Sequence, residues 1–143
     1  MLRMIPAMLL APLLCFGAEQ VVNGYTIAPE AQLQKADLKG ANLKKAALSG
    51  ADLSNAQLHG ASLWEADLTN ANLTGARFNG ANLEHVHLHG ADLSGADFRS
   101  ADLQWADLSG ATIEGTVWSG TKLGGAVWVD GKTCAEGSVG RCN

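Results

Sequence analysis

The side chains most able to do chemistry gather in the middle of this chain. Three histidines alternate in the segment HVHLH, at His85, His87 and His89, and two tryptophans, Trp64 and Trp105, lie before and after them. Imidazole is a common metal ligand, so the histidine spacing could suit a metal ion. Tryptophan is enriched at the hot spots of protein interfaces. The residue types therefore raise two possibilities, a metal site and a surface that contacts a partner.

These residues lie within a repeat of five. From Ala31 to Asp130 the sequence divides without a slip into twenty units, which begin AQLQK, ADLKG and ANLKK. The first position is Ala in all but Val86, Thr116 and Thr121, the third is a large apolar residue, and the fifth is often Gly. Self-similarity at a fixed period is the sequence signature of a solenoid, in which each unit packs only on its neighbours.

A period of five predicts a chain that turns once per unit. Positions one and three lie two apart, so in an extended segment their side chains share a face, which must point inward. Gly, Asn and Ser at position five supply the dihedrals that a tight turn requires. Four such turns would close a square coil, and five coils would form a rod about 24 Å long. The expected core includes Leu43, Leu63, Leu83, Leu103, Trp118 and Trp128.

The repeated A(D/N)LXX pattern of residues 31–130 resembles the pentapeptide-repeat family. The resemblance implies an all-β fold, a right-handed quadrilateral β-helix of about five coils, and it is the source of the handedness and the squareness. Some members of that family dimerise through their C-terminal ends. Others mimic DNA and protect type II topoisomerases from inhibitors.

A square coil places residue n beside residue n+20, which converts the sequence into a surface map. Three adjoining columns then bring the histidines and tryptophans to one corner. The columns are Ala47, Asp67, His87, Asp107 and Val127; Lys45, Glu65, His85, Trp105 and Gly125; and Lys44, Trp64, Glu84, Gln104 and Gly124.

This corner is the expected partner-binding surface, because outward tryptophan is an unusual surface residue unless it contacts something. The alternative for the tryptophans is ordinary surface packing. A metal at His85, His87 and His89 is the other alternative, but a ladder of opposite charges with His87 between two aspartates is the simpler interpretation. We therefore expect no metal and no other cofactor. The partner-binding candidates are Trp64, Glu84, His85, His87 and Trp105.

The two ends of the chain differ from the repeats. Residues 1–17 combine Arg3, an apolar run and small residues at its end, which predicts a secretory signal peptide cleaved near Gly17. The apolar run is shorter than the roughly 20 residues of a membrane-spanning helix. Cys15 raises the alternative of a lipoprotein signal. Residues 18–30 contain an Asn-Gly turn and are expected to cap the first coil.

Removal of the signal peptide leaves two cysteines, Cys134 and Cys142. In an exported chain, two cysteines this close predict a disulfide, worth about 2.5 kcal/mol in the chain-entropy account. Two free thiols or half of a metal site are the alternatives. The disulfide would staple residues 131–143 over the last coil as a C-terminal cap.

Composition and motifs limit the function. The formal net charge of −4 shows no basic excess for nucleic acid, and no catalytic triad or phosphate-binding loop is apparent, so we expect no enzyme. The predicted function is an exported, periplasmic or secreted interaction or structural module of the cell envelope, a monomer or weak dimer. The alternative is a DNA-mimicking protector of a type II topoisomerase. The repeats depart from such a mimic, with 11 acidic and 7 basic residues and four lysines in the first coil.

Overall fold

The computed structural model describes residues 20–143, and the expected signal peptide of residues 1–17 lies outside the described residues. The described chain begins with an antiparallel hairpin of β1 (Gln20–Val22) and β2 (Tyr25–Ile27). Asn23 and Gly24 both have positive φ, 51° and 82°, which is the geometry of a type I′ hairpin turn. Within the described part of the chain, no helix is long and apolar enough to span a membrane.

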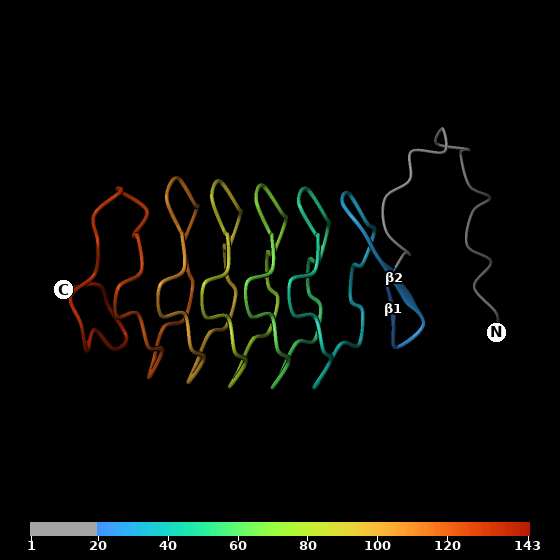
Figure 1. Cartoon of the computed structure of the whole chain (residues 1–143), viewed down its shortest axis with the longest axis horizontal. Coiled ribbons are helices and arrows are strands. Elements are labelled where there is room, and N and C mark those ends of the chain that lie inside the picture. The colour runs from blue at the N-terminus through green and yellow to red at the C-terminus, as the bar shows by residue number, and fades with distance from the viewer. Residues whose placement is uncertain (1–19) are drawn as a thin grey trace.

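After the hairpin the chain winds into a stack of coils that runs from one end of the molecule to the other (Figure 1). The second residue of each unit forms a parallel bridge with the residue twenty positions later, from Gln32 with Asp52 through to Asp107 with Val127. The register holds in every coil, so the predicted n+20 stacking and the five coils are confirmed.

Each unit ends in a β-turn. The N–H of Ala36 donates to the carbonyl of Leu33 (3.0 Å), and the equivalent bond recurs along the repeat. The fifth residue of each unit, from Lys35 to Gly125, has positive φ. This left-handed conformation is favourable for Gly and tolerated by Asn, which explains the residues that the sequence prefers at position five.

Apolar side chains fill the inside of the coils. Leu43, Leu63, Leu83 and Leu103 are fully buried, at 0% exposure. One inward column becomes aromatic toward the C-terminus, where the rings of Phe78 and Phe98 stack with centroids 4.7 Å apart. The interior is thus a packed column of side chains held between successive coils.

The expected core residues Trp118 and Trp128 are only half-buried. Trp118 continues the aromatic column by stacking on Phe98 at 5.0 Å, and it meets Trp128 at a tilt with centroids 5.2 Å apart. Both lie in the last coil, where a neighbouring coil covers one side only. Position in the stack therefore explains their partial exposure.

The N-terminal hairpin packs on the first coil. The hydroxyl of Tyr25 accepts a hydrogen bond from the N–H of Asp37 (3.3 Å), and the side chain of Asn23 donates to the carbonyl of Asp37 (3.3 Å). Gln20 reaches the carbonyl of Asn42 in the same way (3.2 Å). These bonds occupy backbone groups that no earlier coil is present to pair.

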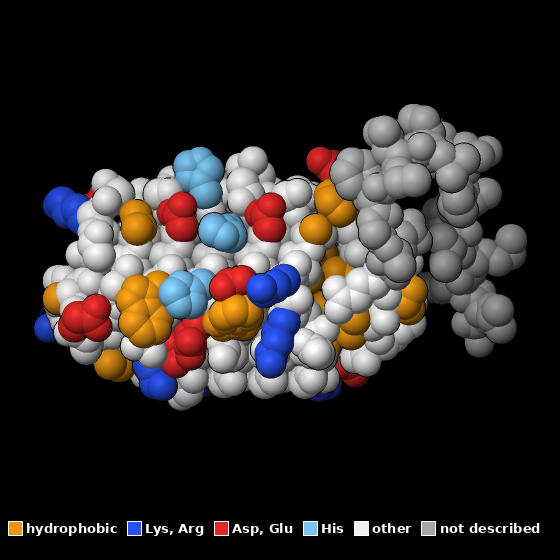
Figure 2. Space-filling view, viewed as in Figure 1, with side chains coloured by type: hydrophobic (Ala, Val, Ile, Leu, Met, Phe, Trp, Pro, Cys, Tyr) orange, Lys and Arg blue, Asp and Glu red, His pale blue; other side chains and the backbone are white. Residues whose placement is uncertain are grey.

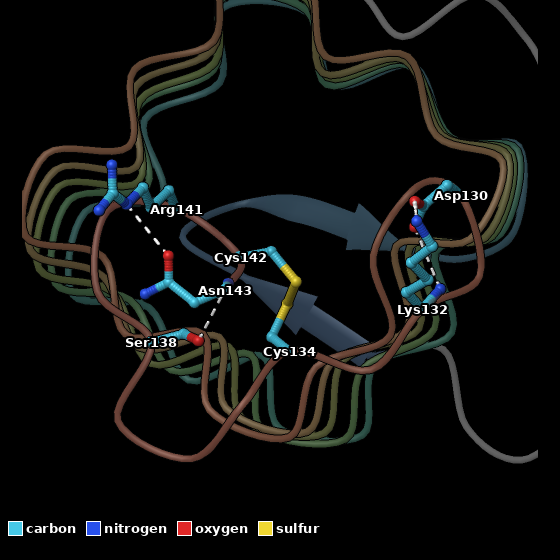
Figure 3. Close-up of a disulfide and its surroundings, with 7 residues drawn as sticks. All are labelled: Asp130, Lys132, Cys134, Ser138, Arg141, Cys142 and Asn143. Carbon is cyan, nitrogen blue, oxygen red and sulfur yellow. Dashed lines mark hydrogen bonds and ion pairs between the residues drawn. A yellow bond between two sulfur atoms is a disulfide. The ribbon is translucent and has the colours of Figure 1, made fainter.

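The C-terminal segment folds over the other end of the stack (Figure 3). Cys134 and Cys142 form the predicted disulfide, with Cα atoms 4.8 Å apart. Thr133 and Val139 make antiparallel bridges with Val127 and Lys122. The cap therefore covers two of the four sides of the last coil. Its thirteen residues are too few to form a full coil of twenty.

Candidate functional site

One corner of the solenoid carries large side chains in the first four of the five coils, and we call it the ladder corner. Figure 2 shows hydrophobic, histidine, acidic and basic side chains gathered in rows on this face of the molecule. The fourth and fifth residues of one unit in each of four successive coils form it, at a turn of the coil. The ladder corner comprises Lys44, Lys45, Trp64, Glu65, Glu84, His85, Gln104 and Trp105.

Its N-terminal half is held by Lys45. The Nζ of Lys45 lies 3.2 Å from Oε2 of Glu65 and 5.1 Å from the ring centroid of Trp64. One ammonium group thus makes an ion pair and a cation–π contact with the next coil. At a solvent-exposed site each contact is worth at most about 1 kcal/mol.

The other half is an aromatic stack. The rings of His85 and Trp105 lie 5.2 Å apart at an angle of 12°. In the next coil, a side chain at Gly125 would collide with the ring of Trp105. The indole therefore lies between His85 and the bare backbone of Gly125. Trp105 remains 46% exposed, so a partner can still reach its edge.

The backbone of the ladder corner is strained. Lys45, Glu65, His85 and Trp105 have φ values of 56°, 53°, 56° and 56°. Left-handed backbone costs roughly 1–2 kcal/mol for a residue with a Cβ. At the other three corners this position becomes Gly, Asn or Ser in most coils. The ladder corner therefore keeps large side chains where small ones would be more stable.

The column next to the ladder corner contains Asp67, His87 and Asp107, joined by successive parallel bridges. Partial burial of the Asp107 carboxyl opposes its ionisation. The hydroxyl and N–H of Ser109 outweigh that effect, with smaller contributions from His89 and His87, and they lower the pKa of Asp107. The structure thus places His87 between Asp67 and Asp107, as the n+20 register predicted.

Ser109 is a member of this cluster that sequence reasoning missed. Its hydroxyl donates to Oδ1 of Asp107 (2.6 Å), so Nδ1 of His89, at 2.9 Å, donates to the hydroxyl. Serine stands between the acid and the imidazole, whereas a catalytic triad places the imidazole in the middle. In this order the hydroxyl donates to a carboxylate and not to an imidazole. The n+20 rule, applied to His89, would have found the contact.

The three alternating histidines do not converge. His85 stacks on Trp105 at the corner, His87 lies on the adjoining flat side, and His89 contacts Ser109 at the next corner. Among residues 20–143 no group of three or more His, Cys, Asp or Glu side chains could hold a metal ion. Of the remaining candidates, Glu84 is half-buried and its carbonyl accepts the N–H of Glu65 (3.1 Å).

Comparison with known proteins identifies the family. Eight copies of the family described as Pentapeptide repeats match residues 25–55, 51–90 and 76–115, more than half of the chain. The chain belongs to the pentapeptide-repeat family, and its fold is the right-handed quadrilateral β-helix that the resemblance implied. A search of curated proteins gave no significant match.

Solved structures of the same family resemble this chain. QnrB1, a plasmid-mediated fluoroquinolone resistance protein, aligns with a TM-score of 0.63 and 28% identity over 66% of this chain and 46% of its own. The chain thus spans less than half of QnrB1. A pentapeptide repeat protein from the Arabidopsis thaliana thylakoid lumen aligns with a TM-score of 0.43 and 26% identity, over 77% of this chain and 83% of its own.

Proposed function

We propose that this chain is an exported, non-enzymatic β-solenoid that binds another protein or an envelope component through the ladder corner. The observation that carries the proposal is the strained backbone at Lys45, Glu65, His85 and Trp105. Strain of this kind persists in folded proteins where the side chains it supports have a function. A rigid stack of coils also holds such side chains at fixed spacings, which suits recognition.

Export rests on two features of the sequence. The charged, apolar and small-residue order of residues 1–17 is typical of a secretory signal. The disulfide between Cys134 and Cys142 is of a kind that persists in oxidising compartments. The proposed location is the periplasm or the extracellular space.

Affinity capture tests the binding surface. Residues 18–143 would be immobilised and exposed to an envelope extract, beside a Trp64→Ala/His85→Ala/Trp105→Ala variant. A Lys39→Ala/His59→Ala/Arg99→Ala variant, altered at a different corner, is the matched control. A protein kept by the wild type and the control but lost by the ladder-corner variant is the expected result. Equal retention by all three would remove the ladder corner from the proposal, and no retention would contradict binding altogether.

Cell fractionation tests the location. The chain would be isolated from its native cells, and its N-terminus and the state of Cys134 and Cys142 determined by mass spectrometry after thiol alkylation. A shortened, oxidised chain outside the cytoplasm is expected. A full-length, reduced chain in the cytoplasm would contradict export.

The second candidate function is that of a DNA-mimicking protector of a type II topoisomerase. The likeness to QnrB1, a fluoroquinolone resistance protein, favours it. The charges argue against it, because ion pairs with Lys39, Lys45, Arg99, Lys122 and Lys132 each engage a carboxylate of the solenoid. A mimic of the DNA backbone needs free negative charge. Restoration of supercoiling by a quinolone-inhibited type II topoisomerase, on addition of the purified chain, would establish this function.

A further inference from the structure

The last coil is completed by the cap on two of its sides. The N–H of Leu123 donates to the carbonyl of Ser138 (2.8 Å). The N–H of Cys134 donates to the carbonyl of Ala126 (2.8 Å). Within the stack, such bonds come from the next coil. The cap therefore acts as a partial extra coil, running antiparallel to the chain beneath it.

The other two sides of the last coil, residues 111–120, have no such cover. One coil earlier, the N–H of Leu93 donates to the carbonyl of Thr112 (2.8 Å), and the carbonyl of Ala91 accepts the N–H of Thr112 (2.9 Å). The equivalent groups of the last coil have no backbone partner within residues 20–143. We call them the open edge: the N–H groups of Ile113, Gly115, Trp118 and Gly120 and the carbonyls of Ala111 and Thr116.

Apolar side chains border the open edge. Val117 is 39% exposed and Val139, in the adjacent cap, is 54% exposed. Ile113 and Trp118 are half-buried. Gly140 of the cap lies against the carbonyl of Trp118, which places the cap at the boundary of the open edge. An unpaired strand edge with apolar neighbours is a template for pairing with another chain.

We propose that a β-strand from a partner protein adds to the open edge along residues 116–120 and extends the last coil beside the cap. Strand addition supplies backbone hydrogen bonds, while side chains of the added strand contact the apolar border. The cap shows that this end of the stack accepts an extended antiparallel segment. The fitting partner is therefore a strand-forming segment with apolar side chains on the face toward Val117 and Val139.

The balance of donors and acceptors favours such a strand over a second copy of this chain. The open edge presents four N–H groups and two carbonyls. Two like edges set against each other would oppose donors to donors and leave several unpaired. A separate strand can instead be placed with its carbonyls opposite both N–H groups of one side, as the last coil is for Leu93 and Gly95. The open edge lies on different sides of the coil from the ladder corner, so this proposal stands independently of the proposed function.

The test places a strand within reach of the open edge. The full chain would be extended after Asn143 by a flexible Gly-Ser linker and the segment Thr-Val-Thr-Val-Thr, since tethering gives a high effective concentration. Amide hydrogen exchange, read by NMR, follows Ile113, Gly115, Trp118 and Gly120. In the unextended chain these amides exchange fast while Leu123, under the cap, is protected. A five-residue strand spans one side of the coil, so the tail is expected to slow Trp118 and Gly120, beside Val117, by about tenfold or more and to leave Ile113 and Gly115 fast.

Control variants distinguish strand pairing from a nonspecific effect of the tail. A tail in which both Val residues are Pro lacks strand geometry and should give no protection. Val117→Lys in the extended chain should weaken the protection, whereas Val21→Lys, an exposed valine at the other end, should not. No protection by the tail, or equal protection by the Pro tail, would overturn the proposal. Protection in the unextended chain that grows with protein concentration would assign the edge to a second copy and overturn it too.

Discussion

The middle of the solenoid and its C-terminal end meet the same packing requirement in different ways. In the middle, Leu and Ala lie between two neighbouring coils and are buried almost completely. In the last coil, Ile113 and Trp118 have a coil on one side only and are half-buried. A repeat unit is therefore stable through its neighbours, and the unit at the end must find other partners.

The residues at position one show how the end compensates. Thr116 and Thr121 replace Ala there, and their hydroxyls donate to the carbonyls of Leu93 and Phe98, each at 2.7 Å. Alanine, which fills this position in most of the middle, can make no such bond. At position one, the end thus adds side-chain hydrogen bonds where the middle has buried alanine.

The largest expected effect comes from a charge in the middle. Leu83→Asp places an unpaired carboxylate at a fully buried position, and we expect a loss above about 4 kcal/mol, enough to abolish cooperative folding. Ile113→Asp, at the half-buried end, should only lower the melting temperature. Circular dichroism melting curves compare the two. Equal effects would mean that middle and end are not different in packing.

Loss of the disulfide should act on the end alone. Cys134→Ser/Cys142→Ser is expected to lower the free energy of unfolding by about 2–3 kcal/mol in urea titration. Amide exchange should then accelerate at Leu123 and Gly125, which the cap protects, and stay unchanged at Leu63. Acceleration along the whole stack would show that the cap supports the middle as well.

A side chain at Gly125 should disturb the junction between the ladder corner and the end. Gly125 has a φ of 71° and lies under the indole of Trp105. Gly125→Ala is expected to cost about 1–2 kcal/mol, from the left-handed backbone and the displaced ring. The cost should be smaller in a Trp105→Ala background. A double-mutant cycle by urea unfolding that gives no coupling would contradict this contact.

Removal of the Thr121 hydroxyl should have a smaller effect. Thr121→Val keeps the shape of the fully buried side chain and deletes its bond to the carbonyl of Phe98, for an expected loss of about 1 kcal/mol. Thr112→Val, at an exposed position of the same coil, is the control and should be close to neutral. If both variants melt like the wild type, the hydroxyl does not stabilise the end.

The smallest effect concerns pH. Hydrogen bonds from the hydroxyl and N–H of Ser94 lower the pKa of Asp92 in the folded chain. Its contribution to stability is therefore present above the unfolded-state pKa, about 3.9, and is lost as the pH falls through the lower folded pKa. Thr112 occupies the same column in the last coil and cannot titrate. Asp92→Asn should flatten the fall in melting temperature below pH 4, whereas Thr112→Val should leave it unchanged.

Much of the fold follows from the repeat itself. A uniform period of five fixes the turns and the inward positions of Leu43 and Leu83. The stacking of His87 on Asp67 also needs the four-sided coil, which the family resemblance implied. The ladder corner could also be located, since column membership needs only the backbone register. Its contacts could not, because Lys45 has several rotamers and the choice of Trp64 and Glu65 as partners depends on how coils pack. The contact of His89 with Ser109 is different, because the register alone places these two residues side by side.

The sequence by itself determined the solenoid, its register and the residues inside it, and it predicted the pairing of Cys134 with Cys142 that the structure shows. The solenoid, the register and the inward residues depend on a local spacing that recurs in all twenty units. Only the tertiary structure decided that the cap covers two sides of the last coil and leaves residues 111–120 open. That division depends on where a short non-repeating segment, held by its disulfide, finds backbone partners among groups distant in the sequence. No periodicity describes such a segment, so its path is set by long-range packing and hydrogen bonding.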